Sequence, residues 1–383
     1  MDFELSDDQV ALRDAAASLL DGRCSMARVR EVAAGLRHLD DELWTAMADQ
    51  GWPAVERPTD GGGLGLGLVE VAVLCEELGR HVAPVPFAGT VLAHGALVEA
   101  GALEAGAGKA LTPDVPLGDA PAGQWAERLA SGEAMGAVAW SQRPDAVRCE
   151  AGPDGLRLVG RADPVVYGPE ADVVIVIAAG PDTAAPHVFA VVGRGVGGDP
   201  EPAMDITRSL SWMAFDHRPA VMIGGTAQAE LLLDRAATAV SAEMLGAADH
   251  VLAMTVQYAK DRIQFGRPIG SFQAVKHRCA DMLVDVEGMR SAAYYAAWAV
   301  GAGDPDSRAA ASAAKVWCSE AARRVMASAL QVHGGIGFTW EHDLHLFLKR
   351  SQLDQVSFGG ATHHRERIAA ILRPRAEAGQ PVL

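Results

Sequence analysis

The sequence has few aromatic residues and no excess of positive charge. Aromatic residues make up 5% of the 383 residues and hydrophobic residues 49%, so Ala, Leu and Val must fill most of the core, which favours helices. The formal net charge of −16 argues against binding to nucleic acid or to an anionic membrane, because both need a positive field. A chain of this length holds two or three domains.

The sequence also lacks clustered cysteines and long apolar runs. Its five cysteines have no Cys-x-x-Cys spacing, which fits a reducing compartment and predicts neither disulfides nor a zinc site. No apolar run reaches membrane-spanning length, and the first five residues carry no signal-peptide pattern. We therefore expect a cytoplasmic protein with no membrane segment and no metal. The five cysteines are Cys24, Cys75, Cys149, Cys279 and Cys318.

The hydrophobic pattern predicts helices, then strands, then helices again. Helical spacing runs through residues 6–99, and residues 100–128 are rich in Ala, Gly and Pro with little periodicity, which predicts a domain boundary. We expect a mainly α chain with an inserted β domain, divided at 1–115, 116–222 and 223–383. The expected strands lie near 137–140, 156–159, 173–177, 187–192 and 212–215, and the later helices near 227–260, 272–300, 307–333, 341–356 and 361–372.

A glycine-rich stretch at residues 61–67 does not predict a dinucleotide-binding turn. Its spacing is not Gly-x-Gly-x-x-Gly, and no strand pattern precedes it. Both features are needed for a Rossmann turn. We expect a loop ahead of a helix.

The most informative stretch is residues 262–277, which links two long helical patterns. Gly266, Pro268 and Gly270 end one helix and begin the next. The stretch carries two arginines, two amides and an aromatic residue, and such a corner suits a pyrophosphate or another anion. A solvated basic turn is the alternative. The residues concerned are Arg262, Arg267, Gln264, Gln273 and Phe265.

A second motif about sixty residues later completes a resemblance to a known family. The pair formed by Arg262-Ile263-Gln264-Phe265-Gly266 and Gln331-Val332-His333-Gly334-Gly335-Ile336-Gly337-Phe338 resembles the acyl-CoA dehydrogenases. The resemblance implies an N-terminal helical domain, a middle β-barrel-like domain and a C-terminal four-helix bundle. It also implies FAD as the cofactor, an acyl-CoA substrate and an electron-transfer flavoprotein as acceptor.

The resemblance places the flavin at named positions. Arg262, Gln264, Phe265 and Gln273 match the corner that contacts the ADP part of FAD, which in the family a neighbouring subunit also holds. Gln331, Gly334 and Gly335 match a glycine turn where backbone reaches a phosphate. An ordinary glycine helix cap is the other interpretation of that turn.

The middle domain departs from the family pattern. Where the family has a loop of hydroxyl and glycine residues against the flavin ring, this chain has Trp140-Ser141-Gln142-Arg143-Pro144. Ser141 supplies one hydroxyl. The remaining ring contacts have no obvious counterpart in this chain.

The family's two usual positions for the catalytic base carry no acid here. The family reaction removes the α-proton of an acyl-CoA with a carboxylate while the β-hydride goes to flavin N5, and the base must be desolvated. One base position matches Phe358 or Gly359, depending on a one-residue choice of alignment. The other matches Ala236.

Glu243 is the acid that helix geometry favours as a replacement. It lies seven residues beyond Ala236, two turns or about 10 Å along the same stripe of a helix, among small residues. We predict Glu243 as the base, although a Glu beside an apolar face is ordinarily a solvated flank. Asp354 and Glu366 are fallback acids.

Four histidines late in the chain do not complete a metal motif. His342 and His345 have a spacing of three residues, but no third ligand follows the pattern of a metal site. We expect surface histidines. The other two are His363 and His364.

Three functions fit these observations. The first is an FAD-dependent acyl-CoA dehydrogenase of lipid metabolism, a homotetramer or heterotetramer acting on a bulky or branched acyl chain. The second is a catalytically silent subunit that completes a flavin or substrate site on a partner chain, which the absent base and the altered loop favour. The third is a relative that acts on a compound other than a thioester, as nitroalkane oxidases do, although it too needs a carboxylate.

Overall fold

The computed structural model describes residues 4–107, 116–118, 120–153, 155–193, 195 and 198–380. The chain forms two compact units, and each is assembled from separate segments. The first unit comprises residues 1–31, 68–83 and 237–383, and the second comprises residues 32–67 and 84–236. The predicted domain bounds at 1–115, 116–222 and 223–383 stay a prediction.

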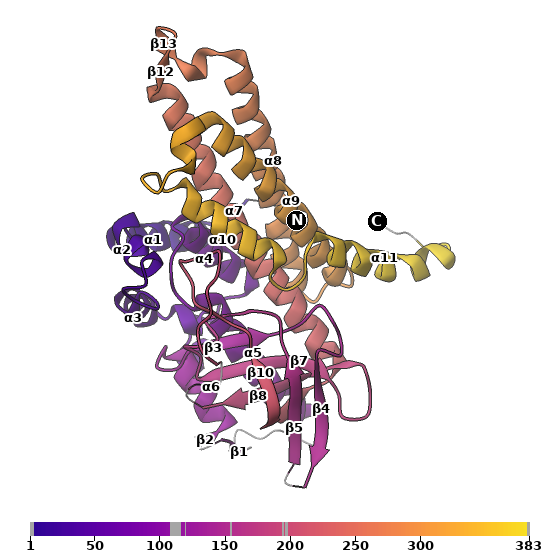
Figure 1. The fold of residues 1–383 in the computed structure, drawn as a ribbon. Helices are drawn as coiled ribbons and strands as arrows, with labels where there is room; N and C mark the ends of the chain where they lie inside the picture. The colour runs from indigo at the N-terminus through magenta and orange to yellow at the C-terminus, as the bar shows by residue number, and fades with distance from the viewer. Residues whose placement is uncertain are drawn as a thin grey trace. The chain divides into compact units, whose positions relative to one another are not determined.

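The first unit is built of helices, several of them long (Figure 1). Its first helix begins with a reciprocal cap, in which Ser6 Oγ accepts from the N–H of Gln9 at 3.3 Å and the Gln9 amide accepts from the N–H of Ser6 at 2.9 Å. Alanines fill much of its core, as the low aromatic content requires. The helices are α1 (Asp7–Arg23), α2 (Met26–Ala33), α4 (Leu68–Arg80), α7 (Thr226–Asp261), α8 (Gln273–Gly301), α9 (Ser307–His333), α10 (Leu344–Val356) and α11 (Ala361–Glu377); α2 and α7 continue into the second unit.

Two glycines let α4 and α7 cross with their backbones in contact. A Cβ at Gly79 would lie 2.0 Å from the carbonyl oxygen of Glu243, and a Cβ at Gly246 would lie 1.7 Å from that of Glu76. Any larger residue at either position forces the two helices apart. The crossing therefore fixes Glu243 and Glu76 at the same level of the first unit.

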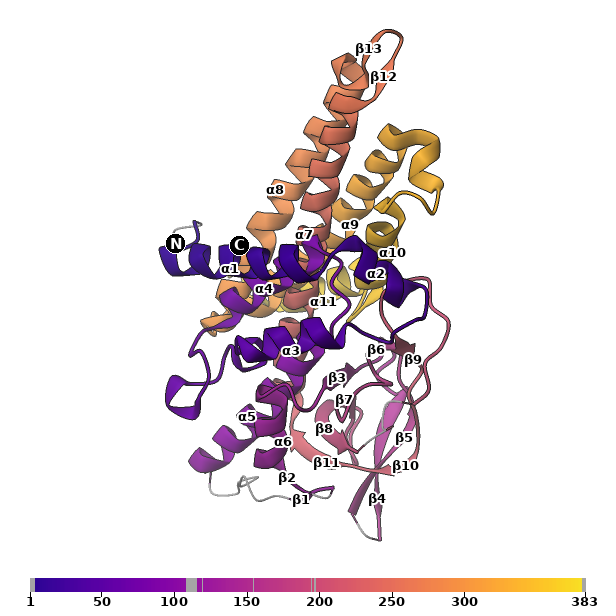
Figure 2. The ribbon, with the colours of Figure 1, turned by 90° about the vertical axis from the view of Figure 1, so that its left-hand side faces the viewer.

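The second unit combines a mixed sheet with shorter helices. Its sheet runs in the order β10-β5-β4-β7-β8-β11, and β3 also pairs with β7. The central strand β7 is buried along its whole length, which suits the continuous apolar run Val173–Ala179. The strands are β3 (Gly136–Ala139), β4 (Val147–Gly152), β5 (Gly155–Arg161), β7 (Val173–Ala179), β8 (Pro186–Val192), β10 (Ala214–Pro219) and β11 (Val221–Gly224), seen in Figures 1 and 2.

Smaller elements complete the second unit. The side chain of Asp40 caps α3 by accepting from the N–H of Leu43 at 3.1 Å. After Gly61, the last residue of η2, residues 62–67 form a loop before α4, as predicted, and none of the described residues ahead of them lies in a strand. The remaining elements are α3 (Asp41–Asp49), η1 (Trp52–Ala54), η2 (Thr59–Gly61), α5 (Phe87–Ala107), β1 (Pro116–Leu117), β2 (Ala120–Pro121), α6 (Ala122–Ala130), β6 (Val165–Val166) and β9 (Leu210–Ser211).

The predicted order of helices, inserted strands and helices is confirmed. The sheet lies between two helical stretches of sequence, and no helix among the described residues is long and apolar enough to cross a bilayer.

Candidate functional site: a hairpin, a glycine turn and a buried carboxylate

The corner between α7 and α8 is a small hairpin. Strands β12 (Ile263–Gln264) and β13 (Arg267–Pro268) pair across Phe265 and Gly266 (Figure 2). Both turn residues have positive φ, 55° and 76°, as a type I′ turn requires. Phe265 therefore adopts a backbone conformation that is costly for a residue with a side chain, and its side chain is 90% exposed.

The hairpin presents groups that bind anions. Arg262, Gln264 and Arg267 are exposed, and the guanidinium of Arg267 lies 4.2 Å over the ring of Phe272. Gln273 is the first residue of α8, and Phe272 offers that helix no side-chain cap. The first N–H groups of α8 thus remain suited to a phosphate.

The glycine turn follows α9 and is open. Gly334 has φ 61°, which favours glycine, and a Cβ at Gly334 or Gly335 would meet no atom within 4 Å. Gln331, one turn earlier, is exposed. This backbone can be approached closely by a ligand.

Tyr258 and His333 bring the hairpin and the glycine turn together. Their rings stack at 4.5 Å, and Tyr258 Oη donates to the His333 carbonyl oxygen at 3.4 Å. Tyr258 also accepts, through its carbonyl oxygen, the N–H of Arg262 at 2.9 Å. The sequence interpretation missed Tyr258, which lies one helical turn before Arg262, and named His333 only as part of the glycine motif.

Ser141 lies in the second unit, in a loop that satisfies its own donors. Ser141 Oγ accepts from the N–H of Arg143 at 3.2 Å, and the N–H of Gln142 donates to Asp163 Oδ2 at 3.0 Å. The Ser141 side chain is 9% exposed. The loop therefore offers a hydroxyl rather than a row of open amides.

Glu243 is buried in an ion pair. Its carboxylate accepts from Arg350 Nη1 at 2.9 Å, and the two side chains are 4% and 0% exposed. Arg350 also lies within 3.4 Å and 3.5 Å of the carbonyl oxygens of Ala83 and Val82. This carboxylate is held in place by a fixed cation.

The turn at the family's usual base position is held by a buried lysine. Lys315 Nζ donates to the carbonyl oxygens of Asp354, Gln355 and Gly359 at 2.9, 2.9 and 3.0 Å, and burial lowers the pKa of Lys315 to about 8. Gly359 has φ 98°, and a Cβ there would lie 2.6 Å from the ring of His363. The family's base position matches either Phe358 or Gly359, and of these two positions only 358 leaves room for a side chain.

The fallback acids lie elsewhere. Asp354 is 1% exposed and sits at the end of α10 beside Lys315. Glu366 is exposed. Its neighbour Arg365 pairs with Glu320 instead.

The expectation of surface histidines is wrong for His364. This residue is fully buried, its Nε2 lies 2.9 Å from the Phe358 carbonyl oxygen, and burial lowers its pKa to about 3. His342, His345 and His363 are half-buried. The described residues contain no group of three or more His, Cys, Asp or Glu side chains that could hold a metal ion.

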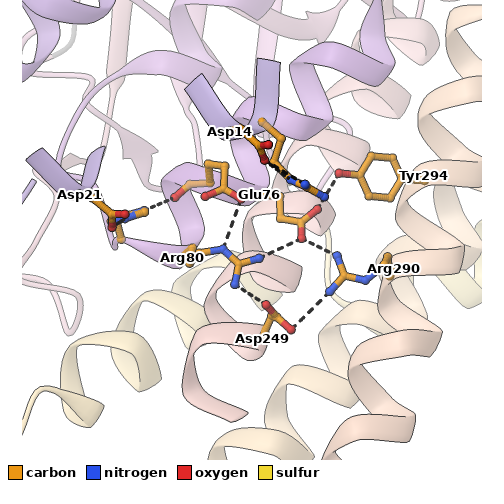
Figure 3. Close-up of polar contacts among 10 residues, drawn as sticks. Asp14, Asp21, Glu76, Arg80, Asp249, Arg290 and Tyr294 are labelled. Carbon is orange, nitrogen blue, oxygen red and sulfur yellow. Dashed lines mark hydrogen bonds and ion pairs between the residues drawn. The ribbon is translucent and has the colours of Figure 1, made fainter. Parts of the chain in front are cut away.

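A charged network that the sequence did not reveal joins α4, α7 and α8 (Figure 3). Glu76 accepts from Arg290 Nη1 at 2.6 Å, from Tyr294 Oη at 2.6 Å and from Arg80 Nη2 at 3.3 Å. Asp249 pairs with both arginines. Burial and the charge of Glu76 raise the pKa of Tyr294, so the phenol stays protonated and donates.

The chain order of helices, inserted strands and helices, together with a hairpin of exposed arginine and amide groups and an open glycine turn, fits a helical dehydrogenase of the flavoprotein type. The chain belongs to the acyl-CoA dehydrogenase family. The family's N-terminal domain matches residues 6–108 and its C-terminal domain matches residues 224–372. Membership confirms the expected enzyme class, an FAD-dependent oxidoreductase, at the level of the family.

Relatives and solved structures agree with this assignment. Acyl-CoA dehydrogenase IpdE2 of Mycobacterium tuberculosis is 36% identical over 347 residues, which cover 90% of this chain and 91% of the relative. A chain of the ChsE4-ChsE5 complex from Mycobacterium tuberculosis superposes with a TM-score of 0.84 at 30% identity, covering 100% of this chain and 100% of that one. A variant of the Tcur3481-Tcur3483 steroid ACAD gives a TM-score of 0.85 at 29% identity, covering 97% of this chain and 99% of that one.

Proposed function

We propose that this chain is one subunit of a heteromeric FAD-dependent acyl-CoA dehydrogenase, and that its partner chain supplies the carboxylate base. The reaction is the α,β-dehydrogenation of an acyl-CoA thioester. The chain contributes binding groups for the flavin and completes the partner's site.

The observation that carries this proposal is the engagement of Glu243 by Arg350. A carboxylate that approaches an α-carbon must be aimed at it, whereas Glu243 is bound at 2.9 Å by a fully buried guanidinium. The two positions that hold the base in the family carry Ala236 and Phe358 or Gly359. No acid of this chain at these positions is available for the proton transfer.

The groups around the glycine turn fit the ADP part of FAD. Guanidinium groups, amides, open glycine backbone and an uncapped helix start are the donors that a pyrophosphate needs. We assign this role to Arg262, Gln264, Phe265, Gln273, Gln331, Gly334 and Gly335. Bound FAD supplies the hydride acceptor.

The flavin ring fits the second unit less well. Ser141 is the hydroxyl we assign to it, but the neighbouring N–H groups of Gln142 and Arg143 already donate to Asp163 and to Ser141 itself. A complete ring site then needs donors from the partner. This favours the heteromer over a chain that works alone.

The relatives suggest the substrate class and the partners. One solved neighbour is a complex of two differently named chains and another is described as a steroid ACAD, so we propose a bulky, branched or polycyclic acyl-CoA as substrate. An electron-transfer flavoprotein as acceptor and a cytoplasmic location complete the proposal. A heterotetramer is the assembly we expect.

The test compares the chain alone with the chain co-expressed with a related subunit. We expect the chain alone to oxidise no acyl-CoA with an artificial electron acceptor, and the co-purified assembly to bind flavin and turn over. Flavin per chain is read from the visible spectrum and the protein concentration. Enzyme-like rates from the chain alone would refute the heteromer.

A second candidate keeps Glu243 as the base of a self-sufficient enzyme. It is favoured by the burial of this acid, which is 3% exposed on α7. Glu243→Gln, which preserves a hydrogen bond to Arg350, decides between the two. If Glu243→Gln loses turnover while it keeps flavin and an intact fold, Glu243 is supported as the base. If the assembly keeps turnover, the heteromer is supported. The matched control is Glu287→Gln, because Glu287 is exposed.

A further inference from the structure

The two ends of the loop that carries the glycine turn are joined by a contact between two histidine rings. This loop runs from Gly334 to Asp343, between α9 and α10, and its first five residues form the short 3-10 helix η4 (Gly334–Phe338). His333, just before it, contacts the ring of His342 edge to face at 4.6 Å. Within the loop, Thr339 Oγ1 donates to the Ile336 carbonyl oxygen at 2.9 Å.

One residue from the other end of the chain binds the same loop. Arg30 of α2 uses all three of its side-chain nitrogens. Its Nε and Nη2 lie 2.8 Å and 2.7 Å from Asp343 Oδ1, and its Nη1 donates to the Trp340 carbonyl oxygen at 2.8 Å. A planar guanidinium can make these three contacts together, which a lysine ammonium on its flexible stem cannot.

Asp343 is committed to this contact instead of to its own helix. It occupies the N-cap position of α10, where an aspartate ordinarily accepts from the helix N–H groups. Here its side chain makes no cap bond. The carboxylate is directed to Arg30, and the N–H of Leu344 is taken by His342 Nδ1 at 3.2 Å.

The same loop carries an exposed aromatic residue. The Trp340 side chain is 66% exposed, yet Lys349 Nζ lies 4.2 Å from its ring centre and His345 contacts it at 4.7 Å. A loop with open glycines and an exposed indole is expected to be mobile unless something orders it. Arg30 supplies that order from outside the loop, and we call its contacts to Asp343 and to the Trp340 carbonyl oxygen the clamp.

We infer that Arg30 is a positioning residue for cofactor binding, acting through Asp343 and the Trp340 carbonyl to hold Gly334 and Gly335 ready for the ADP part of FAD. This inference rests on the proposed flavin-binding role of the glycine turn. Arg30 itself touches no ligand in this scheme. Because Arg30 already orders the loop, FAD binding does not have to offset the conformational entropy of ordering it.

The experiment uses the full chain in the assembly it forms, with Arg30→Ala, Arg30→Lys, Asp343→Ala and the double variant Arg30→Ala/Asp343→Ala. Hydrogen exchange of the amides of residues 334–343 measures the clamp, and the dissociation constant of FAD measures its consequence. Arg13→Ala is the matched control, because Arg13 forms an exposed pair with Asp14 on α1. Circular dichroism confirms the fold of each variant.

We expect faster exchange in the loop and FAD binding about tenfold weaker in Arg30→Ala. Asp343→Ala should have the same effect and the double variant little more, because the residues act as a pair. Arg30→Lys should resemble Arg30→Ala, since charge alone does not restore three contacts.

The outcomes separate the positioning role of Arg30 from the proposed function. Unchanged exchange in the loop overturns the clamp, and faster exchange with unchanged FAD affinity overturns its role in positioning; both leave the proposed function standing. Additive effects in the double variant likewise overturn the pairing of Arg30 with Asp343. A wild-type assembly that binds no FAD overturns the proposed function, and this inference with it.

Discussion

At the scale of single residues, Glu243 and Arg350 illustrate how burial decides the role of a charge. Both side chains are almost fully buried and bound to each other. Removing one partner leaves the other as an uncompensated buried charge, which costs far more than the pair itself contributes. The pair therefore specifies packing whether or not it takes part in chemistry.

We predict that Arg350→Met lowers the free energy of unfolding by about 3–5 kcal/mol. The double variant Glu243→Leu/Arg350→Met should recover most of that loss, because two apolar side chains leave no buried charge. Urea unfolding followed by circular dichroism measures both. A single variant within about 1 kcal/mol of the wild type would mean that the pair behaves as if exposed.

The burial of His94 leads us to predict that the free energy of unfolding decreases at acidic pH. It is 4% exposed, and burial, assisted by the charge of Arg57, lowers its pKa from 6.5 to about 4. The folded state thus needs the neutral imidazole, so its contribution is full above pH 6.5 and is lost as the pH falls toward 4. The loss amounts to at most about 3 kcal/mol.

His94→Gln should flatten that part of the profile. The measurement is the free energy of unfolding in urea between pH 7.5 and pH 4.5, for the wild type and the variant. Parallel profiles for the two proteins would show that His94 titrates in the folded state as it does in the unfolded chain.

At the scale of elements, the crossing of α4 and α7 depends on glycine. Gly246→Ala places a Cβ where only 1.7 Å separates it from the Glu76 carbonyl oxygen. The helices must separate, and we predict a loss of about 2 kcal/mol or more in the free energy of unfolding. Thermal unfolding measures it, with Gly22→Ala on α1 as control, since nothing lies within 4 Å of a Cβ there; equal melting temperatures would refute the tight crossing.

The sequence predicted elements with strong periodicity and missed those set by distant partners. The helix Ser307–His333 and the buried run in Val173–Ala179 follow from local pattern alone. The short strand Val147–Gly152, in which Val147 and Cys149 are buried, was not predicted, since pairing rather than propensity stabilises it. The hairpin at Phe265 was expected only as a corner.

The candidate site divides in the same way. The hairpin donors were expected from the residues of the corner and the glycine turn from the resemblance to the family, and their role in flavin binding stays a prediction. The ion partner of Glu243 was not predicted, because Arg350 lies 107 residues away and no local pattern records that distance. Arg30 and Asp343, 313 residues apart, escaped for the same reason.

At the scale of the whole molecule, an uncovered apolar stripe predicts assembly. Along α8, Val284, Tyr295 and Trp298 are 68%, 37% and 38% exposed. Their spacing places them on one face of the helix, where the exposed polar residues Glu287 and Ser291 lie between Val284 and Tyr295. Large apolar side chains exposed on one face of a helix mark a candidate contact with another subunit. We expect the native mass of the assembly that contains this chain to exceed the 40.1 kDa of one chain.

Val284→Glu should reduce that mass, because a carboxylate buried in an apolar contact has no partner there. The matched control is Leu36→Glu, which changes a side chain that is 74% exposed in the second unit. Light scattering coupled to gel filtration measures both variants over a range of concentrations. If the stripe is an interface, Val284→Glu dissociates at concentrations at which Leu36→Glu stays assembled; identical masses would place the contact between subunits on another face.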